Sequence, residues 1–220
     1  MIVIDCEQRS DEWRKARLGR LTGSNAAAML ATIQKGEAAG RRNLRAQLVL
    51  ERLTGKSAEK SFESQAMKDG VEREADALLQ YEMLTGQIVT RTGFLAHDTL
   101  MAGCSLDGHI GEFEGIIEAK SPIAATHLEY LETGTVPGEY LKQITHNLWI
   151  TGAAWCDWLS YQPDFPESLQ VRQVRVMRDE AAIAEYEAKA KAFLAEVDAK
   201  CAALATMLNL PGVLRAAVVA

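Results

Sequence analysis

The residues most able to do chemistry lie between Leu106 and Lys120, where two carboxylates and an amine are placed to converge. Glu118 and Lys120 are two residues apart, so on a strand their side chains leave the same face. Three glycines in this stretch predict a hairpin, with Asp107 at the end of its first strand and beside that face. Two carboxylates suit Mg²⁺, and a lysine beside them can orient or deprotonate an attacking water. This set is the minimum for metal-assisted hydrolysis of a phosphodiester.

The same residues have a plainer explanation. An exposed strand often carries Glu-x-Lys as a solvated ion pair, and Asp-Gly is a common turn. Taken alone, the residues from Asp107 to Lys120 leave both explanations open, and the solvated pair is the commoner one. The rest of the chain has to decide between them.

The bulk composition narrows the class of protein. The chain has 220 residues, 48% hydrophobic and 25% charged, which is enough for one sizeable α/β domain or two small ones. No apolar run approaches the roughly 18 residues of a membrane span, and nothing resembles a signal peptide. The four cysteines are far apart, which argues against zinc and favours free thiols in a cytosolic protein. The net charge of −6 counts against a general nucleic-acid coat, but a local basic channel remains compatible with it.

An early basic segment offers a phosphate site. Ser10 can cap a short helix that Gly19 ends, and Arg17 lies on that helix among other basic residues. Residues 22–25 then lead into a second helix, whose free backbone N–H groups beside Ser24 and an arginine can bind an anion. Ordinary capping with surface arginines is the alternative.

Hydrophobic periodicity predicts alternating helices and strands. The expected helices cover residues 43–54, 65–85, 127–131, 140–150 and 179–208. The expected strands cover residues 88–95, 100–106, 115–119, 154–161 and 169–176, the last with a bulge at Gln173. Glu74 lies on the helix of residues 65–85, where it is either a third site carboxylate or a plain surface residue.

No repeat or domain boundary is evident, so residues 1–220 are expected to form a single domain. A basic loop is expected at residues 34–43. The long C-terminal helix can cover the sheet or pack against another subunit. For the apolar tail, residues 211–220, docking on a neighbour and fraying both remain open.

Four short blocks then set the residues in a wider pattern. They are residues 13–19 with 22–24, residues 70–74, residues 105–108 with 117–120, and residues 140–143 with 149–152. In this order and spacing, over nearly the whole chain, they resemble the phage lambda-type exonucleases. This is the YqaJ-type viral recombinase family of the PD-(D/E)xK nuclease superfamily. Leu106 stands where the superfamily motif has proline, which changes little because that proline carries no chemistry.

The resemblance implies a fold and a role for each site residue. The fold would be α/β (α+β), with a mixed central β-sheet flanked by α-helices. The implied metal ligands are the side chains of Asp107, Glu118 and Glu74 and the carbonyl of Ala119. Lys120 would position and activate water, and Gln143 would be the family's active-site glutamine. The implied 5′-phosphate site consists of Arg17, Ser24 and Ser105.

The resemblance also implies an activity. The chain would be a Mg²⁺-dependent 5′→3′ exonuclease that degrades one strand of linear double-stranded DNA and leaves a 3′ single-stranded tail. Two Mg²⁺ ions would serve the reaction, with Mn²⁺ as a possible substitute. Expected partners are DNA ends, two further copies in a homotrimeric ring and a single-strand annealing protein, with no membrane. The gene would belong to a phage or prophage, and the protein to the cytoplasm of its bacterial host.

Two other functions stay open at this point. One is a structure- or site-specific endonuclease of the same superfamily, which would cut closed circular DNA. The other is a non-catalytic DNA-binding or assembly subunit that keeps the fold. The intact set of Asp107, Glu118 and Lys120 argues against the second, because a protein that only binds DNA has no need of it.

Overall fold

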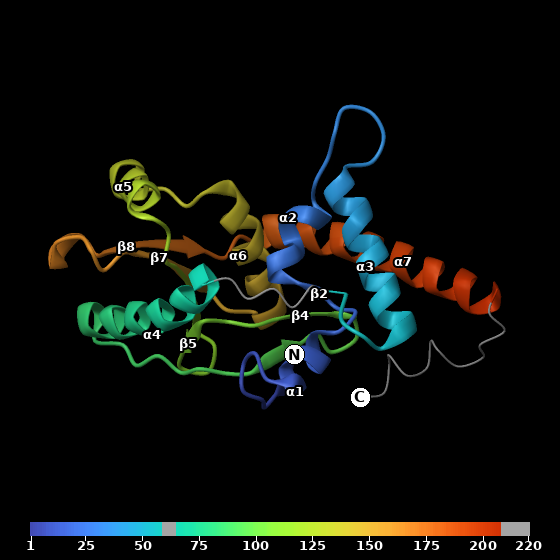
Figure 1. Ribbon diagram of the computed structural model, residues 1–220, viewed down its shortest axis with the longest axis horizontal. Coiled ribbons are helices and arrows are strands. Elements are labelled where there is room, and N and C mark those ends of the chain that lie inside the picture. Colours follow the sequence, from blue (N-terminus) through green and yellow to red (C-terminus); the bar gives the residue numbers. More distant parts are fainter. Residues whose placement is uncertain (59–64, 208–220) are drawn as a thin grey trace.

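The strands of the computed structural model, which describes residues 1–58 and 65–207, form two mixed four-stranded sheets (Figure 1). The first has the order β1-β3-β4-β2, comprising Ile2–Ile4, Phe94–Ala96, Ala102–Cys104 and Leu21–Thr22. The second has the order β5-β6-β7-β8, comprising Gly108–Ile110, Gly115–Lys120, Trp155–Tyr161 and Val171–Met177. The predicted α/β class with a mixed sheet is confirmed, with the strands divided between two sheets rather than joined in one.

The helices flank these sheets close to where periodicity predicts them. They are α1 Asp11–Arg17, α2 Ala26–Met29, α3 Ala39–Thr54, α4 Gln65–Thr85, α5 Ala124–Thr133, α6 Gly138–Thr151 and α7 Glu180–Met207, with short 3₁₀ turns η1 Gly23–Asn25 and η2 Glu167–Leu169. The Ser10 hydroxyl accepts from the Trp13 backbone N–H at 3.1 Å, so the predicted cap of α1 is confirmed. Gly152 ends α6 in the left-handed conformation, as glycine does most readily.

Several predicted boundaries are wrong. The hairpin consists of β5 and β6, so its first strand follows Asp107 instead of ending there, and β4 belongs to the other sheet. The strand expected at residues 88–95 begins only at Phe94, and α3 begins at Ala39 inside the expected loop. Strand β8 has no bulge, because Gln173 pairs with Leu159 in an unbroken register. The alternation of apolar and polar residues breaks at this position because Gln173 is a polar residue on a partly buried face of the strand.

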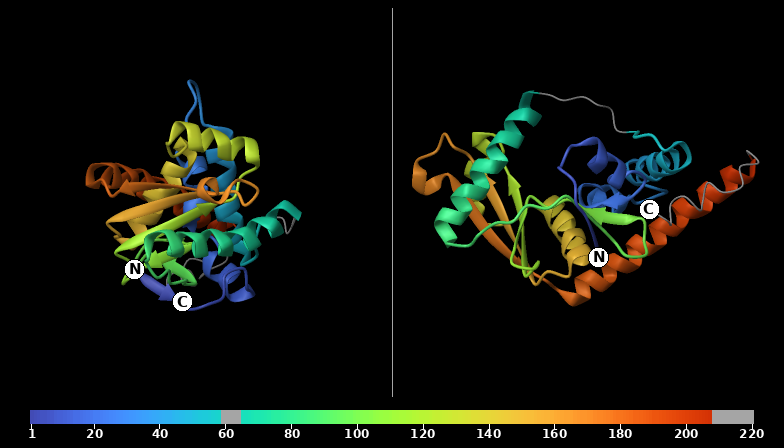
Figure 2. Two further views of the ribbon diagram at one scale, coloured as in Figure 1. Left: turned by 90° about the vertical axis from the view of Figure 1, so that its left-hand side faces the viewer. Right: turned by 90° about the horizontal axis from the view of Figure 1, so that it is seen from below.

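Strand alternation decides which side chains reach the site. Ile117 and Ala119 of β6 pack with Leu78 and Tyr81 of α4 in one apolar cluster. Ile116, on the opposite face of β6, packs in the main core with α6 and α7. Figure 2 shows α4 lying across these strands. Because side chains alternate along a strand, Glu118 leaves β6 on the α6 side.

Buried polar contacts hold α4 against the second sheet. The carboxylate of Asp157 on β7 is fully buried, and it accepts hydrogen bonds from the hydroxyl of Tyr81 at 2.8 Å and from Gln173 at 2.8 Å. Arg175 of β8 donates two further bonds to it, both 2.7 Å long. This cluster fixes the helix that carries Glu74.

The long helix α7 covers this chain's own core. Its residues Tyr186, Phe193 and Val197 are buried in the main core, and α3 packs against it (Figure 1). Arg41 and Arg45 of α3 make ion pairs with Glu196 of α7. The apolar tail of residues 211–220 lies outside the described residues. No helix in the described part of the chain is long and apolar enough to cross a membrane.

Candidate active site

The site begins where the chain crosses from the first sheet to the second. Residues 105–107 connect β4 to β5, and Leu106 is fully buried at the crossing. The side chain of Gln8 donates to the Leu106 carbonyl at 2.7 Å. Oδ2 of Asp107 accepts the backbone N–H of Ala119 at 2.7 Å. Asp107 is therefore fixed beside β6, as predicted, although it precedes a strand instead of ending one.

Glu118 is the buried centre of the site. Its carboxylate accepts hydrogen bonds from Gln143 Nε2 at 2.6 Å and from Asn147 Nδ2 at 3.1 Å, both on α6. Lys120 donates to the same carboxylate. The structure thus brings together Glu118, Lys120 and Gln143 as the sequence predicted. It adds Asn147, which lies one helical turn beyond Gln143 and so on the same face of α6.

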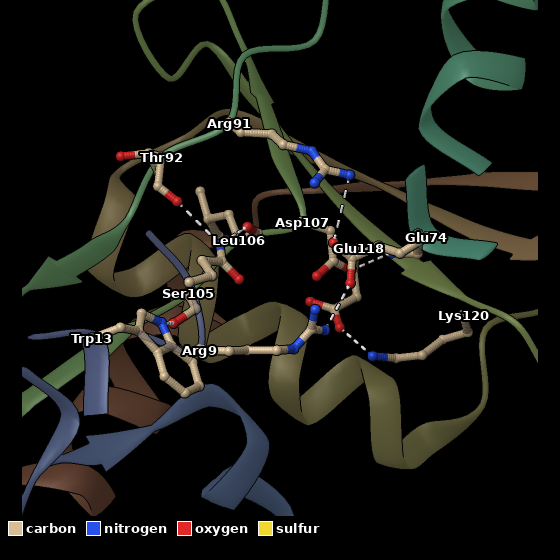
Figure 3. Close-up of polar contacts among 12 residues, drawn as sticks. Arg9, Trp13, Glu74, Arg91, Thr92, Ser105, Leu106, Asp107, Glu118 and Lys120 are labelled. Atoms are coloured by element: carbon tan, nitrogen blue, oxygen red, sulfur yellow. Dashed lines mark hydrogen bonds and ion pairs between the residues drawn. The ribbon is translucent and has the colours of Figure 1, made fainter. Parts of the chain in front are cut away.

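Glu74 reaches the site from α4, where two arginines contact it (Figure 3). Arg9 Nη2 lies 3.3 Å from its Oε2, and Arg91 Nη2 lies 3.8 Å from its Oε1. Within the described residues, no three carboxylate, histidine or cysteine side chains are close enough to form a preassembled metal cage. Instead, Lys120, Arg9 and Arg91 supply positive charge to the carboxylates.

The electrostatics of these carboxylates favour a bound cation. Burial raises the pKa of Glu118 to about 7, and the charge of Asp107 adds to that rise. Burial also raises the pKa of Asp107, and burial followed by the charge of Asp107 raises that of Glu74. Burial alone would lower the pKa of Lys120, but Glu118 and Asp107 outweigh it and raise the value. Buried, mutually repelling carboxylates of this kind suit a hard divalent ion.

A cavity adjoins the carboxylates. A cavity of about 160 Å³ is lined by Arg17, Ser24 and Ser105 together with Glu74 and Asp107. The three residues predicted to hold a phosphate therefore share one cavity with two predicted metal ligands, although they come from widely separated parts of the chain.

Trp13 organises this pocket, and sequence reasoning gave it no role. Its indole N–H donates to the Ser105 hydroxyl at 2.8 Å, and the guanidinium carbon of Arg17 lies 4.2 Å from the indole ring centre. Arg17 Nη1 lies 3.5 Å from the same hydroxyl. The helical spacing of Trp13 and Arg17, four residues apart, was the available signal.

The part of the chain that carries these site residues matches the sequence model of a known protein family. Residues 12–154 match the model of the YqaJ-like viral recombinase domain. The match covers more than half of the chain, so the chain belongs to the YqaJ-like viral recombinase family, and the resemblance inferred from the four sequence blocks is confirmed.

Solved structures agree with this assignment. The chain is similar to LHK-Exo, an alkaline exonuclease from Laribacter hongkongensis, with 38% identity and a TM-score of 0.81 over 91% of this chain and 98% of that one. A structure of LHK-Exo in complex with dAMP gives a TM-score of 0.82 at the same identity and coverage. A phage-related exonuclease from Haemophilus somnus 129PT, 12% identical with a TM-score of 0.66 over 84% of this chain and 96% of that one, shares the fold. No curated protein matches the chain.

Proposed function

We propose that this protein is a Mg²⁺-dependent exonuclease that degrades one strand of linear double-stranded DNA from a 5′-phosphorylated end in the 5′→3′ direction. A nuclease role is supported by the family and by the 38% identity to an alkaline exonuclease. The proposed start at a 5′-phosphorylated end rests on one observation, which is the single cavity that Arg17, Ser24 and Ser105 share with Glu74 and Asp107.

The residues present fit a divalent metal. The side chains of Asp107, Glu118 and Glu74 and the carbonyl of Ala119 would hold it, with two Mg²⁺ ions expected and Mn²⁺ as a possible substitute. Bound Mg²⁺ would supply a lowered pKa for the attacking water and neutralisation of the phosphate charge.

The chain's own groups would do the remaining work. Lys120 would orient the attacking water through its ammonium group, while Gln143 and Asn147 hold the Glu118 carboxylate in place. Arg17 would bind the 5′-terminal phosphate with the hydroxyls of Ser24 and Ser105, since a guanidinium matches phosphate oxygens in charge and shape.

A fixed anion pocket explains why such an enzyme would start at an end. It sets the distance from the terminal phosphate to the carboxylates, so each cut presents a new 5′-phosphate to the same place. The product would be a 3′ single-stranded tail, suited to a single-strand annealing partner. A homotrimeric ring around the DNA would give processivity despite the net charge of −6, because enclosure replaces electrostatic affinity.

Digestion of matched DNA substrates tests the proposal. Linear duplexes with 5′-phosphate or 5′-hydroxyl ends and covalently closed circles are incubated with Mg²⁺ or with EDTA. We expect Mg²⁺-dependent loss of linear DNA only, faster with a 5′-phosphate and absent for Lys120→Ala. Lys142→Ala is the matched control, because Lys142 is exposed on α6 beside Gln143 and should keep full activity.

Other outcomes would overturn the proposal. Cutting of closed circles would indicate an endonuclease. DNA binding with no cleavage of any substrate would indicate a binding or assembly subunit.

A further inference from the structure

Arg9 has a backbone conformation that its residue type rarely adopts. Its φ is +70°, in the left-handed region that glycine occupies freely and other residues occupy at a cost. Such a conformation persists only where the surrounding structure holds it in place, and it is found often at functional sites. The Arg9 side chain extends from this point, just before α1, to Glu74 on α4.

The contact between Arg9 and Glu74 uses oxygens that a metal would need. Arg9 lies against Oε2 of Glu74, and Arg91, from the segment before β3, lies against Oε1 (Figure 3). A cation bound at these two oxygens would lie close to both guanidinium groups, and the like charges would repel one another. Metal binding by Glu74 would therefore displace at least one of the arginines.

Arg9 is well placed to move to another anion. Its side chain is 46% exposed, whereas that of Glu74 is only 17% exposed, so the arginine can reorient without leaving a buried charge. It also lines the cavity that contains Arg17 and Asp107. Any DNA strand that runs from the Arg17 pocket to the carboxylates passes through this cavity and brings backbone phosphates with it.

We propose that Arg9 is a DNA-binding residue that exchanges partners: it pairs with Glu74 in the metal-free protein and with a backbone phosphate of the bound strand when a divalent metal occupies the site. This inference rests on the proposed function of Glu74 as a metal-site carboxylate. Its consequence is coupling. Metal binding releases the Arg9 guanidinium for DNA, and DNA binding releases the Glu74 carboxylate for the metal. Each ligand should therefore raise the affinity for the other by the same factor.

The variant Arg9→Gly tests the exchange without endangering the fold. Glycine adopts a φ of +70° without strain, so the variant loses the guanidinium but keeps the backbone. Arg14→Ala is the matched control. It removes one arginine from the neighbouring helix, where Arg14 pairs with Asp11 at 3.1 Å and lies outside the cavity lining.

Two measurements report on the two partners. Calorimetric titration of the DNA-free protein with Mg²⁺ should show roughly three- to tenfold tighter binding for Arg9→Gly, because a competing cation is gone. Binding of a 5′-phosphorylated duplex, measured by fluorescence anisotropy in a Lys120→Ala background that prevents cleavage, should weaken by roughly three- to tenfold in Mg²⁺. In EDTA, where Glu74 holds Arg9, the loss should be less than about twofold.

The salt dependence gives a third signature. In Mg²⁺, loss of one phosphate contact should reduce the slope of log affinity against log salt by about 0.7 to 0.9. A purely structural role of Arg9 would not tighten metal binding or change that slope.

Failure of this inference differs from failure of the proposed function. A wild-type protein that digests linear DNA, with Arg9→Gly matching Arg14→Ala in metal affinity and DNA affinity, overturns the exchange alone. Equal weakening of DNA binding in Mg²⁺ and in EDTA also overturns it, since the arginine would then contact DNA regardless of the metal. A wild-type protein that neither binds Mg²⁺ nor cleaves DNA overturns both.

Discussion

Gly23 lies in the turn before α2, in close contact with α6, and a single methyl group there should disturb the site. A Cβ at this position would lie 2.3 Å from Oδ1 of Asn147 and 3.4 Å from Cγ of Gln143. Asn147 is 1% exposed and donates to Glu118 at 3.1 Å, so its side chain cannot move into solvent. Gly23→Ala must therefore push Asn147 away from Glu118 or move the turn away from α6.

The expected cost follows from overpacking. Forcing a methyl group into a packed interior typically costs about 1–3 kcal/mol. The upper part of that range applies if the hydrogen bond from Asn147 to Glu118 is also lost. In a domain of this size each kcal/mol lowers the melting temperature by about 2–4 °C. We expect the melting temperature to fall by about 2–12 °C, and Mg²⁺-dependent cleavage to decrease because Glu118 is misplaced.

Thermal unfolding of matched variants checks this reasoning. Gly138→Ala, at the start of α6, is the control, because a Cβ there has no atom within 4 Å. In the Asn147→Ala background the clash is absent, so adding Gly23→Ala should cost little. Equal melting temperatures for Gly23→Ala and Gly138→Ala would refute the steric argument, as would an undiminished penalty in the Asn147→Ala background.

Three further predictions concern charge. Burial raises the pKa of Glu118 to about 7 from the usual 4.5, so the folded protein keeps a proton that the unfolded chain releases between these values. The metal-free free energy of unfolding should therefore fall as pH rises from about 5 to 8, and saturating Mg²⁺ should remove the slope, as urea unfolding at both pH values would show. Asp157→Ala should lower the free energy of unfolding, measured in urea, by about 2–3 kcal/mol. The buried Tyr81 loses its hydrogen-bond partner, while the half-exposed Arg175 can rehydrate. An unchanged midpoint of the urea transition would contradict this. Arg17→Ala should reduce the preference for 5′-phosphate over 5′-hydroxyl ends by roughly tenfold or more, with Mg²⁺ affinity unchanged.

Helices were predictable wherever the signal was local. The apolar spacing over residues 65–85 and 179–208 and the glycines that follow several helices gave bounds within one or two residues of α4 and α7. The strands were harder. Only residues 105–107 separate β4 from β5, and nothing local in them indicates that the chain changes sheet. Residues 100–106 were therefore expected as the first arm of the hairpin, and the residues of β5 as part of its turn.

The sequence by itself determined the chemical groups and their local geometry. The two-residue spacing of Glu118 and Lys120 put both side chains on one face of a strand, because strand side chains alternate whatever surrounds them. The same holds for the Ser10 cap, which depends only on residues three positions apart.

Only the tertiary structure decided which of these groups meet. The contact of Asp107 with the β6 backbone depends on where two sheets join, and the contact of Glu74 with Arg9 joins residues 65 positions apart. The place of Asn147 beside Glu118 and Gly23 depends on how α6 packs. Such contacts depend on the burial of apolar faces over the whole molecule. Because this driving force is non-directional, the sequence near the contacting residues does not show which partners they will have.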